Sequence, residues 1–136
     1  MDKINLINFQ KINIIKNNKG NLYKILNNKK KLHNINEIYC STIKPKKIKA
    51  WRLHKKITNK FVLLRGKVIL IAHKNNKYQK ILISKKKFGF FIIKPNTWYG
   101  FKCIGNEESL ILNLINKKFK ENEILRAENS KFNFIW

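Results

Sequence analysis

The sequence is poor in cysteine and has no long apolar run. Cys40 and Cys103 are its only cysteines, and they form neither a CxxC pair nor a disulfide framework. We therefore expect two free thiols, each a small buried side chain. No apolar run reaches the length of a membrane span, and Asp2, Lys3 and Asn5 interrupt the segment that an export signal would need. These absences predict a cytoplasmic protein that does not insert into membranes.

Arginine is also scarce, although the chain is strongly basic. The net charge is +24, from 31 basic residues against 7 acidic ones, and only Arg52, Arg65 and Arg126 are arginines. Lysine, asparagine and isoleucine have codons made largely of A and T, so a biased genome produces this profile in any protein. A nucleic-acid domain would gather its lysines on one face with aromatic residues between them. Because the lysines are spread along the whole chain, we expect no specific nucleic-acid partner, only weak attraction to polyanions at low salt.

Short apolar and alternating runs recur at strand length, and polar turns such as Asn75-Asn76 separate them. Only Glu121–Glu128 is predicted to be a short helix. About ten strands without a long helix predict an all-β sandwich or barrel in one domain, residues 1–136. The predicted strands are Ile4–Phe9, Lys11–Ile15, Leu22–Leu26, Glu37–Ile43, Ile48–Leu53, Phe61–Leu64, Val68–His73, Tyr78–Ser84, Phe88–Ile93, Trp98–Cys103 and Ser109–Ile115.

One histidine has a distinctive spacing. His54 is followed twelve residues later by Gly66, which resembles the first half of a cupin signature. A metal-binding cupin would add a histidine two residues before His54 and a glutamate five residues after it, where this chain has Arg52 and Asn59. A guanidinium has no lone pair to give a metal, and an amide oxygen is a poor substitute for a carboxylate. The sequence therefore predicts no metal and no cofactor.

Four blocks of sequence extend this resemblance over nearly the whole chain, from about Lys19 to Trp136. They are Lys19–Tyr23; Glu37–Thr42 with Ile48–Trp51 and Leu53–Lys56; Ile93, Pro95, Trp98, Gly100 and Phe101; and Phe132–Trp136. Together they resemble the short relatives of dTDP-4-dehydrorhamnose 3,5-epimerase, which are jelly-roll cupins of nucleotide-sugar metabolism. The resemblance implies an antiparallel cupin jelly roll, a homodimer in which residues 1–18 are N-terminal strands open to exchange, and a nucleotide-sugar substrate inside the barrel.

The resemblance also implies an activity and its residues. The family removes a proton next to the ketone of a nucleotide-linked 4-keto-6-deoxy sugar, and His54 falls at the position of its catalytic base. The family's second histidine is Tyr99 here, which we expect to serve as a replacement acid. The family's catalytic tyrosine falls near Leu112, and its orienting aspartate lies in an extension that this chain lacks. Arg52 and Lys19 are the predicted substrate-binding residues.

Two further functions stay open at this point. Related sugar 3,4-ketoisomerases share the fold and the substrate class, so the reaction could be a keto shift. A non-catalytic cupin that binds a nucleotide sugar in a surface-polysaccharide pathway is the third reading, because no aligned acid or orienting carboxylate is visible in the sequence. We further expect Trp51 to face away from His54, His33 and His73 to lie at the surface, and Asn96 to occupy a left-handed turn.

Overall fold

The structure is a computed structural model, and it describes residues 2–3, 5–27, 30 and 34–136. His33, which we expected at the surface, lies outside these residues. Among the residues described, no helix is long and apolar enough to cross a membrane.

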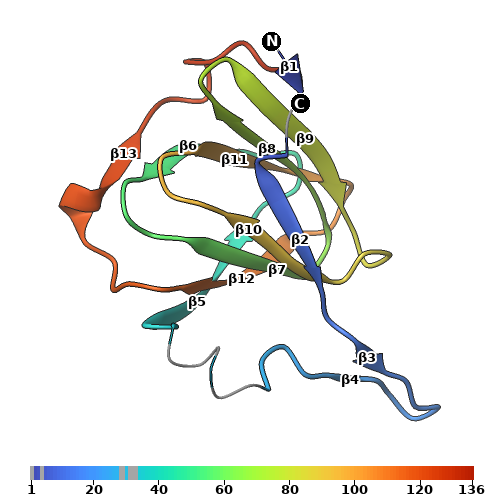
Figure 1. Ribbon diagram of the computed structural model, residues 1–136. Coiled ribbons are helices and arrows are strands. Elements are labelled where there is room, and N and C mark those ends of the chain that lie inside the picture. Colours follow the sequence, from blue (N-terminus) through green and yellow to red (C-terminus); the bar gives the residue numbers. More distant parts are fainter. Residues whose placement is uncertain (1, 4, 28–29, 31–33) are drawn as a thin grey trace.

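Two sheets face each other, and a small two-stranded arm extends from one end (Figure 1). The six-stranded sheet has the order β1-β9-β8-β11-β6-β13, with bounds Asp2–Lys3, Lys77–Ile83, Lys67–Lys74, Trp98–Ile104, Ile48–His54 and Ile124–Arg126. The five-stranded sheet has the order β2-β10-β7-β12-β5, with bounds Ile7–Lys11, Gly89–Ile93, Asn59–Arg65, Ser109–Ile115 and Glu37–Ile43. The arm pairs β3 (Ile14–Ile15) with β4 (Leu22–Tyr23). All of these pairs are antiparallel except β1 with β9. The predicted all-β jelly roll is confirmed.

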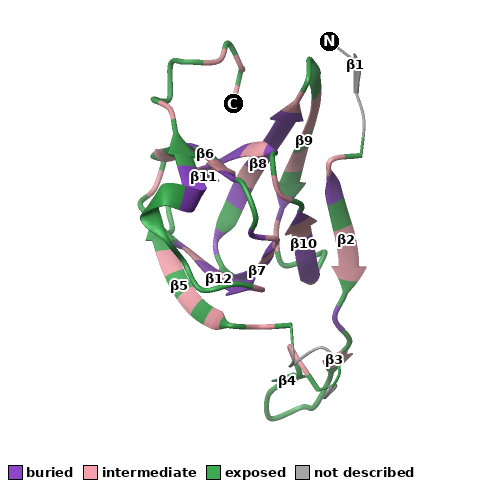
Figure 2. Cartoon of the chain, turned by 60° about the vertical axis from the view of Figure 1, so that its left-hand side comes forward, coloured by how far each residue is buried: buried purple, intermediate pink, exposed green. Residues whose placement is uncertain are grey.

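The main core lies between the sheets, and a second apolar cluster covers the outside of the five-stranded sheet. Neighbouring residues of a strand point to opposite faces, so Phe61 and Leu63 of β7 enter the main core while Val62 packs outward. The outer cluster adds Phe90 and Leu114 from the strands beside β7. Figure 2 shows the result as buried residues along the central strands of both sheets. The five-stranded sheet is therefore packed on both of its faces.

Local turn chemistry follows the sequence closely. Asn75 and Asn76 have φ of 50° and 60°, the left-handed pair of a two-residue hairpin, and Asn96 has φ of 62°. The backbone N–H of Asn96 donates to the carbonyl of His54 at 2.7 Å, so this turn also anchors the end of β6. The left-handed turn predicted at Asn96 is confirmed.

Two expectations about exposure and helicity are wrong. The predicted helix at Glu121–Glu128 is a 3-10 turn, η1 (Glu121–Glu123), followed by β13. The exposed edge of β6 offers unpaired backbone groups, and residues 124–126 pair with it instead of coiling. Cys103 is buried as expected, but Cys40 is exposed because its side chain points to the outer face of β5, opposite to Tyr39 and Ser41, which line the cavity between the sheets.

The C-terminal segment packs its aromatic rings on the outside of the six-stranded sheet. Trp51 is 1% exposed there, with ring centroids 5.6, 5.4 and 5.1 Å from those of Phe132, Phe134 and Trp136. Trp51 is therefore directed away from His54, as expected. His73 belongs to the same cluster, with its ring 4.2 Å from that of Phe132. Because these rings cover it, the expected surface position of His73 is wrong.

Candidate active site

The end of β6 places His54 inside the sandwich. The side chain is 3% exposed, and both ring nitrogens have partners. Nδ1 lies 2.9 Å from Oε2 of Glu123, and Nε2 lies 3.1 Å from the hydroxyl of Tyr99 on the neighbouring strand β11. A carboxylate, a histidine and a phenol therefore form one continuous hydrogen-bonded chain, Glu123–His54–Tyr99.

Glu123 corrects the expectation that no carboxylate orients the histidine. It comes from η1, which follows β12 along the chain. Its Oε1 accepts hydrogen bonds from the backbone N–H groups of Lys56 and Ile57, at 3.0 and 3.1 Å. Its own carbonyl accepts from the N–H of Lys55 at 2.9 Å. These three hydrogen bonds, two to the carboxylate and one to the backbone carbonyl, hold Glu123 on the loop after β6 with its carboxylate against the imidazole.

The charge of Glu123 follows from these contacts. Burial acts to raise the pKa of its carboxyl, but the hydrogen bonds from His54 and from two backbone amides outweigh burial and hold the pKa below its ordinary value. An ionised carboxylate can only accept hydrogen bonds. Nδ1 of His54 must therefore carry the hydrogen, which leaves Nε2 of the neutral ring as an acceptor facing Tyr99.

Tyr99 keeps its proton. Burial raises the pKa of its phenol above the ordinary value, the nearby Tyr39 and Glu123 raise it further, and the cation of Arg52 opposes them. A protonated phenol can donate to Nε2 of His54, and the two rings lie nearly parallel, with centroids 5.9 Å apart. Tyr99 thus points inward, which is the orientation that the expected role of a replacement acid requires.

A cavity of about 80 Å³ adjoins Tyr99. Arg52 and Tyr99 line it from the six-stranded sheet, and Tyr39 and Asn113 line it from the five-stranded sheet. His54 is not among its lining residues, so the imidazole reaches the cavity only through the hydroxyl of Tyr99. Leu112, near which the family's catalytic tyrosine falls, packs in the outer cluster instead, and its neighbour Asn113 faces the cavity.

Lys19 lies apart from this group. It is exposed, in the turn between β3 and β4, where its backbone N–H donates to the side chain of Asn17 at 2.9 Å. The structure therefore brings together His54, Tyr99 and Arg52, but within one chain it does not bring Lys19 to them.

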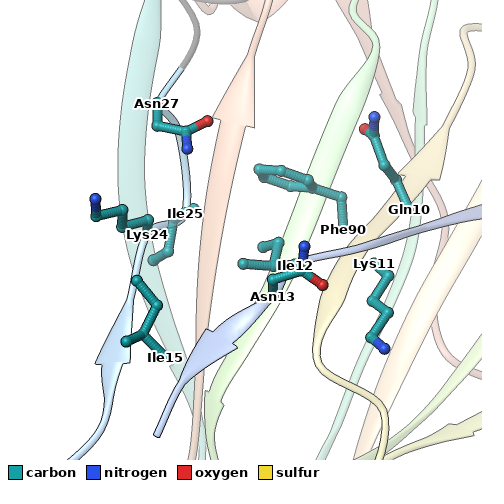
Figure 3. A pocket seen from close by; sticks show the side chains of 9 residues that line it. All are labelled: Gln10, Lys11, Ile12, Asn13, Ile15, Lys24, Ile25, Asn27 and Phe90. Atoms are coloured by element: carbon teal, nitrogen blue, oxygen red, sulfur yellow. The ribbon is translucent and has the colours of Figure 1, made fainter.

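Two other cavities differ from this one in their lining. One of about 200 Å³ lies where the arm meets β10, and Figure 3 shows Lys24 and Ile25 of the arm opposite Ile12 and Phe90. Its lining residues include two lysines but no histidine, carboxylate or tyrosine. Another, of about 520 Å³, adjoins Glu123 and is lined by Lys55, Lys56, Ile57, Lys117, Lys118, Lys120, Asn122 and Glu123. No aromatic side chain lines it, so it lacks the stacking surfaces of a single-strand nucleic-acid site.

Metal-ligating side chains do not gather anywhere in the described part of the chain. No group of three or more His, Cys, Asp or Glu residues lies close enough there to hold an ion. Residues 52 and 59, where a metal-binding cupin has ligands, are Arg52 in the cavity wall and a buried Asn59 that pairs with Asn113 at 2.9 Å.

Comparison with known proteins gives one family match and several similar folds. Residues 2–135 match the family model described as "FdtA: WxcM-like, C-terminal". A dTDP sugar isomerase from Desulfovibrio desulfuricans G20 has a TM-score of 0.85 at 20% identity, over 94% of this chain and 87% of that one. QdtA, a sugar 3,4-ketoisomerase from Thermoanaerobacterium thermosaccharolyticum solved with TDP, has a TM-score of 0.78 at 19% identity, over 91% and 90%. The rmlC epimerase of Mycobacterium tuberculosis has a TM-score of 0.75 at 9% identity, over 90% and 69%. No curated protein matches the sequence.

Proposed function

Because the chain belongs to the FdtA, WxcM-like C-terminal family, we propose that it is an isomerase acting on a nucleotide-linked 4-keto-6-deoxy sugar. The reaction moves a proton next to the ketone, in the cytoplasm, in the biosynthesis of sugars for surface polysaccharides. The single observation that carries the proposal is the chain Glu123–His54–Tyr99, which ends at a cavity. The same observation weighs against the non-catalytic reading, whose basis was the apparent lack of an acid and an orienting carboxylate.

The geometry supports proton transfer through Tyr99. The phenol oxygen takes the proton from the carbon beside the ketone while the phenol proton passes to Nε2 of His54. The imidazolium that forms is paired with the carboxylate of Glu123, and the electron pair of the C–H bond becomes an enolate in the cavity. The positive charge of Arg52 stabilises the enolate oxygen. Reversal of the relay returns a proton to the substrate.

Two products are open to the same enolate. Return of the proton to the other face of the same carbon is epimerisation, as in the 3,5-epimerases. In a 3,4-keto shift, the proton of the neighbouring hydroxyl first passes to the former keto oxygen. The proton on the relay then returns to the former keto carbon, and the neighbouring carbon becomes the new ketone. The likeness to QdtA, a 3,4-ketoisomerase, is closer in sequence than the likeness to the rmlC epimerase, at 19% against 9% identity. This difference favours the keto shift.

Deuterium exchange tests the proposal. The protein is incubated with dTDP-4-keto-6-deoxyglucose in D2O, and NMR follows the protons beside the ketone and the identity of the product. We expect deuterium at one carbon beside the ketone, and no incorporation with His54→Asn. Binding of the sugar with neither exchange nor product formation by the wild-type protein would refute the enzyme and leave a binding protein.

The relay itself has a separate test. If Tyr99 carries the proton between substrate and His54, Tyr99→Phe abolishes exchange as completely as His54→Asn, because the phenyl ring has no proton to pass on. If His54 removes the proton directly, Tyr99→Phe still incorporates deuterium but forms little product. Circular dichroism and thermal unfolding of both variants establish that they are folded.

A homodimer is part of the proposal, and it offers a way for Lys19 to reach a ligand. Exposed apolar side chains lie on the arm and on the outside of the five-stranded sheet, among them Tyr23 at 47% and Leu64 at 39% exposure, and both line one cavity. In a dimer formed there, the arm of one subunit could bring Lys19 to the ligand of the other.

Light scattering should give twice the mass of the chain, and Leu64→Asp should give a monomer. Lys19→Gln should then raise KM, with Lys16→Gln as the matched control.

A further inference from the structure

Asn113 is a polar side chain in an apolar strand. It stands in β12 between Leu112 and Leu114, is 2% exposed, and faces the cavity that Tyr39, Arg52 and Tyr99 also line. Burying an amide in such a place is unfavourable unless its donors and its acceptor all find partners. The hydrogen bonds of the Asn113 side chain therefore indicate which chemical group a ligand must bring into the cavity.

The amide of Asn113 uses both of its hydrogens within the protein. Nδ2 donates to the hydroxyl of Tyr39 at 2.8 Å and to Oδ1 of Asn59 at 2.9 Å. Turning over the Asn113 amide alone would place its oxygen against the oxygen of Asn59, and two acceptors repel. The Tyr39 hydroxyl accepts from Asn113, which leaves its own hydrogen for another acceptor.

The oxygen of the same amide has no partner. Oδ1 of Asn113 is one of only two fully buried side-chain polar atoms without a hydrogen bond among the described residues; the other, Nε2 of His73, lies in the aromatic cluster outside the sheet. A buried acceptor without a donor is costly. Because Asn113 lines the cavity, a ligand that brings a hydroxyl to Oδ1 there removes this cost.

The size of the cavity limits which part of a ligand can do this. About 80 Å³ is well below the volume of pockets that enclose whole drug-sized ligands. A nucleotide base does not fit, but the reacting side of a sugar ring does, and its polar groups are hydroxyls and the ketone. Arg52, which is exposed at the same cavity, supplies the positive charge beside this side of the ring.

We propose that Asn113 determines specificity, with its Oδ1 accepting a hydrogen bond from a ring hydroxyl of the bound sugar. This inference rests on the proposed function, since it takes the ligand to be a keto sugar. Tyr39, held by Asn113, donates its hydrogen to a second oxygen of the same ring. Together the two groups select a sugar that presents a donor and an acceptor side by side.

The test compares substrates and variants in a cycle. Exchange is measured with dTDP-4-keto-6-deoxyglucose and with its 2-deoxy and 3-deoxy analogues, for the wild type and for Asn113→Leu, which is similar in shape. The wild type should prefer the parent over one analogue by about 10-fold in kcat/KM, about 1.4 kcal/mol, the size of one neutral hydrogen bond. Asn113→Leu should reduce that preference to about 2-fold or less.

Asn59→Asp is the matched control. It changes the neighbour of Asn113 but keeps an oxygen that accepts from Nδ2, so Oδ1 of Asn113 keeps its orientation and the preference should persist. A loss that is equal for parent and analogue in Asn113→Leu, with the preference unchanged, would overturn the proposal and make Asn113 a structural residue.

Calorimetric titration separates this outcome from failure of the proposed function. If the wild-type protein binds the sugar but neither exchanges nor forms product, the enzyme proposal fails, and the same preference is read in Kd. A wild type that binds parent and both analogues equally would overturn the role of Asn113 whether or not the protein is an enzyme.

Discussion

Replacement of Glu123 by glutamine should invert the hydrogen bond that orients His54. The carboxylate accepts on both oxygens, with Oε1 serving two backbone N–H groups and Oε2 serving His54. A glutamine has only one acceptor oxygen. If the oxygen turned to His54, the backbone N–H groups of Lys56 and Ile57 would both lose their acceptor, which costs more free energy than losing the one bond to His54. The oxygen therefore stays with Lys56 and Ile57, and the NH2 group turns to His54. Nδ1 must then accept, and the hydrogen moves to Nε2.

The size of the effect follows from that change of tautomer. A histidine with hydrogen on Nε2 cannot take the proton of Tyr99, so the relay stops. The same carboxylate-to-amide change behind the histidine of a serine protease lowers kcat by roughly 10⁴-fold, and we expect a loss of roughly 10³- to 10⁴-fold in exchange rate. Stability should fall by about 1–3 kcal/mol, because one hydrogen bond to a charged group is lost.

Two measurements and one control decide the prediction. Nitrogen NMR of the imidazole reports which nitrogen carries the hydrogen, and deuterium exchange reports the rate. Glu121→Gln removes the same charge two residues away, from an exposed carboxylate that pairs with Arg126 at 2.7 Å, and should change the rate by less than about 2-fold. A Glu123→Gln protein that retains hydrogen on Nδ1, or exchanges at the wild-type rate, would refute the reasoning.

Three further predictions concern pH and packing. Burial lowers the pKa of His73 to about 4. Below pH 6.5 the histidine is therefore protonated in the unfolded chain but still neutral in the folded one. The contribution of His73 to stability is complete above pH 6.5 and falls as the pH drops toward 4. His73→Phe should lose less of its Tm than the wild type between pH 7 and pH 5, and an equal loss would contradict the assignment. The pKa of Glu123 is also lowered, so its contribution is present above the unfolded carboxyl pKa and is lost in acid; the Tm of Glu123→Gln should depend less on pH below about pH 5. Gly100→Ala should destabilise the fold by about 1–3 kcal/mol in denaturant unfolding, since a Cβ there would meet Ala50 and the ring of Trp136; an unchanged midpoint would show that the C-terminal segment is packed more loosely.

The strands were predictable because alternation reports directly which face is buried. The bounds of Glu37–Ile43 and Ser109–Ile115 came out as expected, and the turns at Asn75-Asn76 and Asn96 followed from the tolerance of asparagine for positive φ. His54 stood out through its distance from Gly66. Such features depend on residues close together in the chain, so they can be predicted from a single sequence.

Glu123 and Asn113 were missed because their roles depend on distant partners. Glu123 is 69 residues from His54, and no local pattern distinguishes it from Glu121 or Glu128. A weak signal was present, since three of the seven acidic residues of a very basic chain lie within residues 121–128. Asn113 carried a signal too, as the one polar residue in the apolar run from Leu110 to Ile115.

The position of Glu123 in the chain has a consequence for synthesis. The ribosome makes His54 at the end of β6, then the strands β7 to β12, and only afterwards the segment that carries the carboxylate. A nascent chain that has emerged as far as β12 contains the histidine and the tyrosine but nothing to hold the imidazole in its working tautomer. The carboxylate that holds the imidazole is therefore added only after most of the sheet residues that enclose His54 and Tyr99 have been made.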